Sequence, residues 1–222
     1  MKKLLMAVPK GRILEDLQPL FKKINLIPEK DFFNPSSRKL VFSTNNKNLD
    51  LVQVRSFDVA TFVKFGAADI GICGSDVLEE FSSKEIFPVL DLGVGKCRLS
   101  IAAHKSVKLD LEKKSHIRIA TKYTAIAQNY FSALGIQVEA VKLNGSIEIA
   151  PQLKLCDFIL DLVSSGKTLA ENNMVELKEI MSVSSYLIIN RASFKVVNEE
   201  INQLIEQFDI YNCHPHEGWD PA

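Results

Sequence analysis

The most informative stretch of the sequence is an apolar segment that ends on a carboxylate and leads into a loop of small, hydroxyl-bearing residues. Residues 157–169 have the sequence DFILDLVSSGKTL. Successive backbone N–H groups in such a loop can point at one anion, and serine and threonine hydroxyls add donors. Gly166 would let a phosphate approach the backbone without a Cβ in the way. Asp161 is placed to accept hydrogen bonds from sugar hydroxyls beside that phosphate.

A second interpretation of the same loop is an ordinary turn between a strand and a helix, in which Ser165 or Thr168 caps the helix. The segment is not a Walker loop, because the spacing GxxxxGK[ST] is absent. The sequence of this segment alone leaves the anion site and the helix cap as alternatives.

Cations follow two other apolar segments. The sequence Pro9-Lys10-Gly11-Arg12 comes directly after a predicted buried strand at 4–8, and open α/β sheets bind ligands at the carboxyl ends of their strands. Arg12 could clamp a phosphate with two parallel hydrogen bonds, or the loop could simply carry two solvated cations. Arg55 also ends an apolar strand, and Asp76 lies in a glycine-rich turn where it could be structural or functional.

Short β-branched apolar segments alternate along the chain with segments of helical period. The expected strands are 4–8, 40–43, 51–54, 69–73, 99–103, 117–121, 136–141, 158–162 and 185–189, and the expected helices are 13–24, 59–66, 125–134, 147–155 and 194–208. The polar residues 45–48 predict a hairpin between two of these strands. The alternation predicts an α/β fold with mainly parallel sheets.

The alternation starts again near the glycines at 93–95, which predicts two lobes. We expect 1–93, completed by 189–222, to form the first lobe, and 94–188 to form the second, which carries the hydroxyl-rich loop. A cleft between lobes is a common place for a ligand. The last ten residues, 213–222, show no periodicity and are expected to form a tail.

The composition excludes several classes of protein. The 222 residues include 27 Lys plus Arg and 27 Asp plus Glu, a net charge of zero, whereas a nucleic-acid binder would carry a basic excess. No stretch approaches the roughly 18 apolar residues of a membrane span, and the first apolar run is too short for a signal peptide. We therefore expect a cytoplasmic protein that binds neither nucleic acid nor membranes.

The four cysteines do not suggest a structural or catalytic cluster. They are scattered without a CxxC pair, which argues against a disulfide framework or a zinc site. The sequence CHPHE at 213–217 contains metal-ligand types, but its short spacing and proline suit no standard zinc site. No histidine or cysteine stands out as a nucleophile.

Several motifs that are weak one by one occur in a fixed order. They are PKGR at 9–12, RSFD at 55–58, GAADIGICGSD at 66–76, DLGVGKCR at 91–98, RIATKY at 118–123, GSIEIAP at 145–151 and DLVSSGKTL at 161–169. This ordered set, which extends from about residue 7 to residue 190, resembles the ATP phosphoribosyltransferase family, which opens histidine biosynthesis. The chain departs from the family pattern at Lys154-Leu155-Cys156, where the family often has small residues. This difference affects the expected packing before the strand that leads into the loop, and not the loop itself.

The resemblance implies a two-lobed fold like that of type II periplasmic binding proteins. It also implies transfer of the phosphoribosyl group of 5-phosphoribosyl 1-pyrophosphate to N1 of ATP, with Mg²⁺ as the cofactor. Carried over by matched position, the residues for the 5′-phosphate and ribose are Asp161, Ser164, Ser165, Gly166, Lys167, Thr168 and Leu169. Arg12 and Arg38 would be catalytic, facing the pyrophosphate and the ATP phosphates. Further candidates for lining the ATP site are Lys10, Gly11, Arg55, Asp76 and Glu148.

The family has a long form with a C-terminal regulatory domain and a short form without one. About thirty residues follow residue 190, where the resemblance ends, too few for another compact domain, so the resemblance is to the short form. It implies a homodimer of catalytic subunits that assembles with a regulatory subunit related to histidyl-tRNA synthetase into a hetero-oligomer. The apolar face of the closing helix at 194–208 is expected to pack on its own lobe or to join an interface.

Two other functions fit parts of the sequence. One is a non-catalytic, two-lobed module that closes on a small anion. The acidic residue before the hydroxyl-rich loop favours a ribose phosphate over a bare anion as the ligand, which argues against this function. The other is a phosphoribosyltransferase for a different base, which would share every residue of the donor site. Release of pyrophosphate would distinguish an enzyme from the first function. The identity of the base that accepts the phosphoribosyl group would distinguish transfer to ATP from the second function.

Overall fold

The computed structural model describes residues 3–107 and 114–212 and is built on two sheets. Its contacts divide the chain into two compact units. The first comprises Met1–Leu78, Ser82–Gly95 and Ser184–Ala222, and the second comprises Glu79–Phe81 and Lys96–Val183. Among the described residues, no helix is long and apolar enough to cross a membrane.

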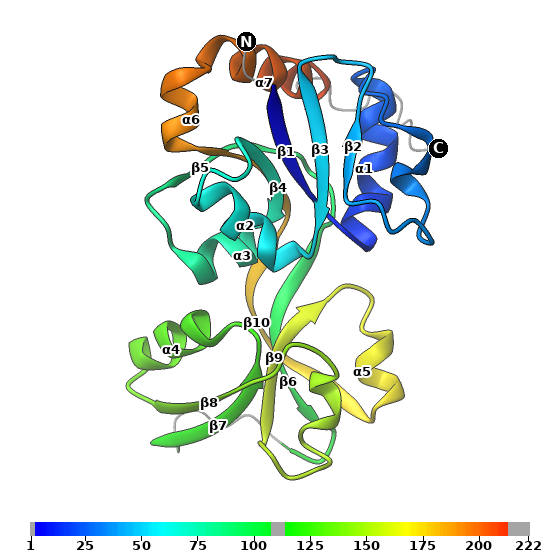
Figure 1. The fold of residues 1–222 in the computed structure, drawn as a ribbon. Coiled ribbons are helices and arrows are strands. Elements are labelled where there is room, and N and C mark those ends of the chain that lie inside the picture. Colours follow the sequence, from blue (N-terminus) through cyan, green and yellow to red (C-terminus); the bar gives the residue numbers. More distant parts are fainter. Residues whose placement is uncertain (1–2, 108–113, 213–222) are drawn as a thin grey trace, which may run out of the picture. The chain divides into compact units, whose positions relative to one another are not determined.

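The first unit has a six-stranded sheet in the order β2-β3-β1-β4-β11-β5 (Figure 1). The strands are β1 (Leu4–Pro9), β2 (Val41–Ser43), β3 (Leu49–Val54), β4 (Ile70–Gly74), β5 (Ile86–Asp91) and β11 (Ser185–Asn190). The helices are α1 (Arg12–Lys23), η1 (Lys30–Phe33), α2 (Ser56–Lys64), α3 (Ser75–Phe81), α6 (Arg191–Val196) and α7 (Asn198–Asn212). Strand β1 runs parallel to β3 and β4, and the remaining pairs are antiparallel.

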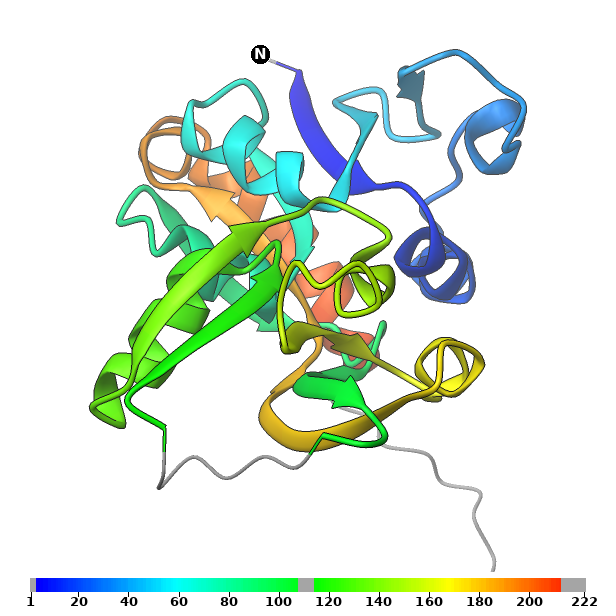
Figure 2. The ribbon, with the colours of Figure 1, turned by 90° about the horizontal axis from the view of Figure 1, so that it is seen from below.

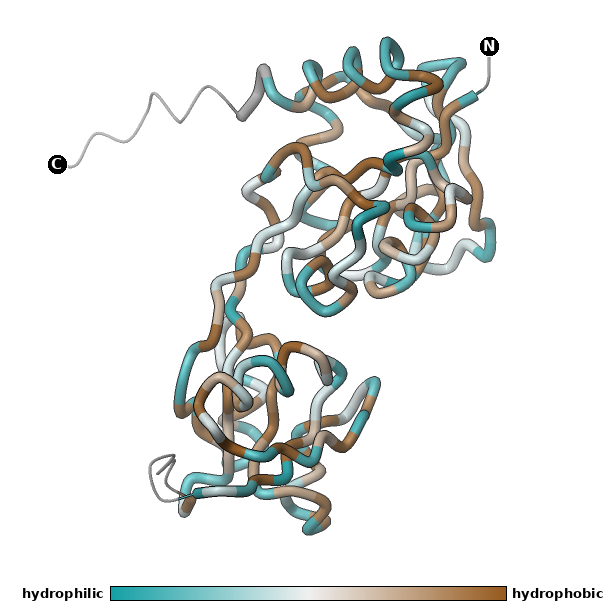
Figure 3. The backbone as a smooth tube through the Cα atoms, turned by 90° about the vertical axis from the view of Figure 1, so that its left-hand side faces the viewer, coloured by the Kyte–Doolittle hydropathy of each residue, from teal (hydrophilic) through white to brown (hydrophobic). Residues whose placement is uncertain are grey.

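Aromatic rings join the helices of the first unit to its sheet. Phe21 of α1 lies 6.2 Å from Phe32 of η1 and 6.3 Å from Phe208 of α7, measured between ring centroids. Phe32 in turn lies 5.2 Å from Phe42 of β2. Apolar and polar residues alternate along α7 (Figure 3), and its apolar side belongs to the same core as β1. The closing helix therefore packs on its own unit, one of the two roles expected for it.

The second unit has a five-stranded sheet in the order β10-β6-β9-β7-β8. Its strands are β6 (Cys97–His104), β7 (His116–Thr121), β8 (Gln137–Lys142), β9 (Phe158–Val163) and β10 (Met174–Val183), and its helices are α4 (Thr124–Ala133), η3 (Ile147–Ile149) and α5 (Lys167–Glu171). Strand β7 runs parallel to β8 and β9, whereas β6 is antiparallel to β9 and β10. Helix α4 lies along β8 (Figure 2).

The α/β class predicted from the sequence is confirmed, but both sheets are mixed rather than mainly parallel. Each of these parallel pairs contains β1 or β7, and both strands were predicted from their apolar runs. Strands β5 and β10 were not predicted. Much of each is exposed or only half-buried, so neither forms a continuous apolar run or a strict alternation.

Two predicted helices differ in the structure. Instead of a helix at 147–155 there is a three-residue 3-10 helix, η3, followed by turns in which Lys154 has φ +58°. The single helix predicted at 194–208 is divided at Val197, whose φ of −130° is not helical, into α6 and α7. Asn190 caps α6, and its side chain accepts hydrogen bonds from the N–H groups of Ala192 and Ser193.

Gly71 of β4 provides a test of the packing between sheet and helix in the first unit. A Cβ at this position would lie 2.7 Å from Val63 Cγ2 and 2.8 Å from Val59 Cγ1 of α2. Overpacking of a core usually costs about 1–3 kcal/mol, so we expect Gly71→Ala to lower the free energy of unfolding by about that amount. The control is Gly145→Ala, whose new Cβ would meet nothing within 4 Å and should change it by less than about 0.5 kcal/mol. Urea denaturation measures both, and equal midpoints would contradict the packing.

Candidate functional site

The hydroxyl-rich loop connects β9 to the short helix α5. Gly166 has φ +75° and ψ 0°, a left-handed conformation that favours glycine, and a Cβ there would meet nothing within 4 Å. No side chain caps α5, although Ser165 Oγ accepts a long hydrogen bond of 3.4 Å from the Lys167 N–H. Ser164, Ser165, Lys167 and Thr168 are all exposed. The loop thus presents its small polar groups to solvent, and the long contact of Ser165 is the one that resembles a helix cap among the hydrogen bonds described for this loop.

A carboxylate and an ammonium group lie at the base of this loop. Asp161 Oδ1 accepts a hydrogen bond of 2.8 Å from the Leu162 N–H and lies 3.8 Å from Lys122 Nζ. Lys122 follows β7 directly, and β7 and β9 are parallel neighbours, so both side chains lie near the carboxyl ends of adjacent strands. Open α/β sheets bind ligands at this edge.

The position of Lys122 is fixed by the residue before it. The buried Thr121 hydroxyl donates a hydrogen bond of 2.7 Å to the Leu160 carbonyl of β9 and accepts one of 2.9 Å from the Tyr123 N–H. In the sequence Lys122 is part of the motif at 118–123 but was not predicted as a site residue. Its place directly after an apolar strand, as with Lys10 and Arg55, was the signal that could have found it.

In the first unit, Lys10 and Arg55 directly follow the neighbouring parallel strands β1 and β3. The Lys10 N–H, after β1, donates a hydrogen bond of 2.9 Å to the Val54 carbonyl at the end of β3, and Arg55 comes next. Gly11 has φ +90° and precedes α1 without a side-chain cap. Arg12 is the first residue of α1 and, like Lys10 and Arg55, is exposed.

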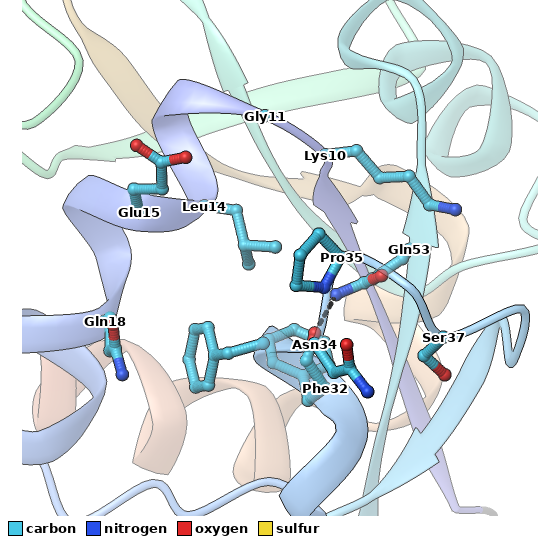
Figure 4. A pocket seen from close by; sticks show the side chains of 11 residues that line it. Lys10, Gly11, Leu14, Glu15, Gln18, Phe32, Asn34, Pro35, Ser37 and Gln53 are labelled. Atoms are coloured by element: carbon cyan, nitrogen blue, oxygen red, sulfur yellow. Dashed lines mark hydrogen bonds between the residues drawn. The ribbon is translucent and has the colours of Figure 1, made fainter.

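A cavity of about 290 Å³ opens beside this edge of the first unit (Figure 4). Its wall combines apolar side chains with polar groups from α1, β3 and the segments that follow β1 and η1. The lining residues are Lys10, Gly11, Leu14, Glu15, Gln18, Phe32, Phe33, Asn34, Pro35, Ser37 and Gln53. The Gln53 side-chain amide donates a hydrogen bond to the Phe32 carbonyl. A mainly apolar cavity with a few fixed polar groups is typical of a small-molecule site.

The cavity brings together two of the residues predicted for ATP, Lys10 and Gly11, while other predicted residues lie elsewhere. Arg12, Arg38, Arg55 and Asp76 are not among the residues that line it. Arg38 is exposed on the segment before β2, and Asp76 is buried in the first turn of α3, with 4% of its surface exposed. In the second unit, half-buried Glu148 lies in η3, which packs on β9.

The cysteines that the structure describes form no disulfide with one another. Cys73, Cys97 and Cys156 are free, and Cys73 and Cys156 are buried. Burial raises the pKa of the Cys73 thiol far above its ordinary value, so this thiol is a poor nucleophile at neutral pH. Cys213 and the neighbouring CHPHE segment lie outside the described residues.

Comparisons with known proteins agree on one family. The sequence model of HisG, described as ATP phosphoribosyltransferase, matches residues 55–209. The chain is 50% identical to an ATP phosphoribosyltransferase of Rhodospirillum rubrum over 93% of this chain and 92% of that protein. It is also 50% identical to one of Sphingopyxis alaskensis, over 92% of both chains.

Solved structures agree on the fold. The ATP phosphoribosyl transferase (HisG:HisZ) complex from Thermotoga maritima contains a chain that is similar with a TM-score of 0.77 and 30% identity, over 93% of this chain and 96% of that one. The periplasmic aliphatic sulphonate binding protein SsuA from Escherichia coli matches with a TM-score of 0.58 at 13% identity, over 94% of this chain and 68% of that one. The second likeness shows the fold alone and confirms the expected architecture of a periplasmic binding protein. The match to the family model and the identity over nearly the whole chain show that this chain belongs to the ATP phosphoribosyltransferase family.

Proposed function

We propose that this chain transfers the phosphoribosyl group of 5-phosphoribosyl 1-pyrophosphate to N1 of ATP. The products are N1-(5-phosphoribosyl)-ATP and pyrophosphate, and the reaction is the first step of histidine biosynthesis. The observation that carries the proposal is the uncapped, exposed loop after β9, with Asp161 and Lys122 at its base, in a member of this family. The loop offers backbone and hydroxyl donors for the 5′-phosphate. Asp161 offers acceptors for the ribose hydroxyls.

The bond that forms joins adenine N1 to ribose C1, and the bond that breaks joins C1 to the pyrophosphate oxygen. Positive charge develops on the sugar ring while negative charge develops on the leaving group, so cations that contact the leaving group lower the barrier. Arg12 and Arg38 are the residues that we assign to this role. Adenine N1 already carries a lone pair, so the reaction needs no strong general base.

For ATP we assign the cavity at Lys10 and Gly11 as part of the acceptor site. Its apolar wall of Leu14, Phe32 and Phe33 suits the flat faces of a purine, and Lys10 can meet a phosphate. Arg55, Asp76 and Glu148 keep the assignment that the family resemblance gives them, as further residues of this site.

Mg²⁺ is the metal that we propose for the reaction. Among the described residues no group of three or more His, Cys, Asp or Glu side chains could hold a metal ion. Mg²⁺ commonly keeps several waters and is bound through substrate phosphates and one or two carboxylates, and Asp161 offers a carboxylate at the base of the proposed sugar-phosphate loop. When bound, the ion would neutralise charge on the pyrophosphate.

We also propose a partner. The complex from Thermotoga maritima pairs HisG with HisZ, and we infer that this chain assembles with a HisZ-like regulatory subunit, related to histidyl-tRNA synthetase, around a homodimer of catalytic chains. Co-purification of the two subunits, followed by mass measurement in solution, would test the assembly.

The reaction is tested by a pyrophosphate-release assay with ATP, 5-phosphoribosyl 1-pyrophosphate and Mg²⁺. We expect turnover that requires ATP and forms a phosphoribosylated nucleotide, and no turnover when other purines or pyrimidines replace ATP. Turnover only with another acceptor would overturn the assignment of ATP and keep the donor site. Absence of turnover with every acceptor, also after addition of a HisZ-like subunit, would favour the non-catalytic anion-binding module.

Arg12→Ala tests the leaving-group role. Removal of one group that stabilises charge in the transition state costs about 10²–10³ in kcat, so we expect a fall in kcat of that order with a smaller change in KM for 5-phosphoribosyl 1-pyrophosphate. Lys23→Ala, at the other end of the same helix, is the matched control and should leave both constants unchanged. Steady-state kinetics with each substrate varied measures the effects, and a change confined to KM would contradict the role.

Gly166→Ala tests the loop. Placing alanine in the left-handed region costs about 1–2 kcal/mol, so the loop should be displaced and the KM for 5-phosphoribosyl 1-pyrophosphate should rise. Gly135→Ala is the control, because Gly135 has φ +71°, close to the +75° of Gly166, and also has nothing within 4 Å of the new Cβ. Both variants should lose similar stability, and only Gly166→Ala should raise this KM. An equal effect of the two variants on KM would contradict the loop's role in binding the donor.

A further inference from the structure

A guanidinium group lies beside the hydroxyl-rich loop and holds one of its carbonyls. Arg98 of β6 donates from Nη1 to the Ser164 carbonyl at 3.2 Å. The other side of the same guanidinium group is taken by Glu176 of β10, which accepts from Nε at 2.6 Å and also from Nη2. Ser100, which is fully buried, donates from Oγ to Glu176 at 2.8 Å. One planar group thus connects β6, β10 and the first residue of the loop.

The strand register places this cluster next to the proposed sugar-phosphate site. In the antiparallel pair of β6 and β9, Arg98 is opposite Val163 and Ser100 is opposite Asp161. Directly opposed residues lie on one face of a sheet, so Asp161 shares its face with Arg98 and Ser100. Glu176 is opposite Ala102 of β6 and lies on this face as well.

The fixed carbonyl has a consequence for the next peptide N–H group. In a planar trans peptide the carbonyl of one residue and the N–H of the next point in opposite directions. Because Arg98 holds the Ser164 carbonyl, the Ser165 N–H is directed away from Arg98. This N–H belongs to the loop that the proposed function assigns to the 5′-phosphate.

Glu176 sets the orientation of Arg98 and offsets its charge. A two-point contact between a guanidinium and a carboxylate fixes the plane of both groups, and the hydrogen bonds from Arg98 lower the pKa of Glu176. The side chains of Arg98 and Glu176 are 34% and 25% exposed, so the pair is partly shielded from solvent. With its charge matched by Glu176, Arg98 acts on the loop through one directed hydrogen bond.

We infer that Arg98, oriented by Glu176, is a positioning residue that fixes the Ser164–Ser165 peptide of the loop for binding the phosphate of 5-phosphoribosyl 1-pyrophosphate. The inference rests on the proposed function and adds to it a pair of residues that need not touch the substrate. It predicts a selective effect on the donor substrate, because ATP is assigned to other residues.

The test uses Arg98→Lys and Glu176→Gln in the full-length chain, together with its regulatory subunit if the wild type requires one. Lysine keeps the charge of Arg98 but lacks the planar fork, and glutamine keeps the shape of Glu176 but not its charge. A hydrogen bond to a charged group corresponds to about 10–100-fold in binding, so the KM for 5-phosphoribosyl 1-pyrophosphate should rise by about that factor in Arg98→Lys. Glu176→Gln should show a smaller rise of the same KM, and the KM for ATP should stay within about twofold in both.

The matched control is Arg118→Lys. Arg118 of β7 also contacts a glutamate across a strand pair, with Nε 2.8 Å from Glu139 Oε2, but both side chains are about half exposed. This substitution should leave both KM values unchanged. Thermal melting of each variant reports whether the fold is kept.

A purely structural role of Arg98 would lower the melting temperature without moving the KM for 5-phosphoribosyl 1-pyrophosphate, and that result would overturn the inference. A parallel rise in both KM values would overturn it too. If Arg98→Lys does not fold, Glu176→Gln decides by the same criteria. Calorimetric titration of 5-phosphoribosyl 1-pyrophosphate into wild type and Arg98→Lys gives a readout that does not depend on turnover. Equal affinities would overturn the inference alone, and a wild type that neither turns over nor binds this compound would overturn the proposed function with it.

Discussion

The parallel pairing of β1 and of β7 with the strands on either side of them is the constraint on which the remaining structure depends. β1 lies between β3 and β4, and β7 lies between β9 and β8. Parallel neighbours end at the same edge of a sheet, so residues that follow different strands are brought together there. In the first unit the Lys10 N–H contacts the Val54 carbonyl directly before Arg55, and in the second unit Lys122 lies near Asp161.

The central strands and long helices could be predicted because each buries a continuous or periodic set of apolar side chains. The edge strands β5 and β10 could not, since their residues are largely exposed or half-buried and the stabilising partner is another strand far away in the sequence. The predicted helix at 147–155 was wrong for a related reason. Its helical spacing of apolar residues is real, yet Leu153 and Leu155 are 61% and 43% exposed and bury no helical face.

In the candidate site, too, features that depend on local sequence could be predicted, and contacts between distant strands could not. The loop at 164–168 could be proposed as an anion site from the sequence, because small hydroxyl-bearing residues and a glycine follow an apolar strand, although this segment alone left a helix cap as the alternative. The contacts of Lys122 and Arg98 could not be recognised, because they depend on which strands are neighbours and in which register. Both residues belong to motifs that are visible in the sequence. The motifs do not reveal that Lys122 lies beside Asp161 or that Arg98 donates a hydrogen bond to the Ser164 carbonyl.

The distribution of charge indicates that the sugar phosphate and the polyphosphate groups of the substrates would be recognised in different ways. With a net charge of zero, the chain has no overall positive field to attract polyphosphates, so local groups must do so. In the first unit the exposed cations Lys10, Arg12 and Arg55 lie at or just after strand ends. In the second unit the charge of Arg98 is matched by Glu176, and Lys122 lies near Asp161. Under the proposed function, the sugar phosphate is therefore held mainly by directed hydrogen bonds of the loop, whereas the polyphosphate groups are held by exposed cations whose effect weakens with salt.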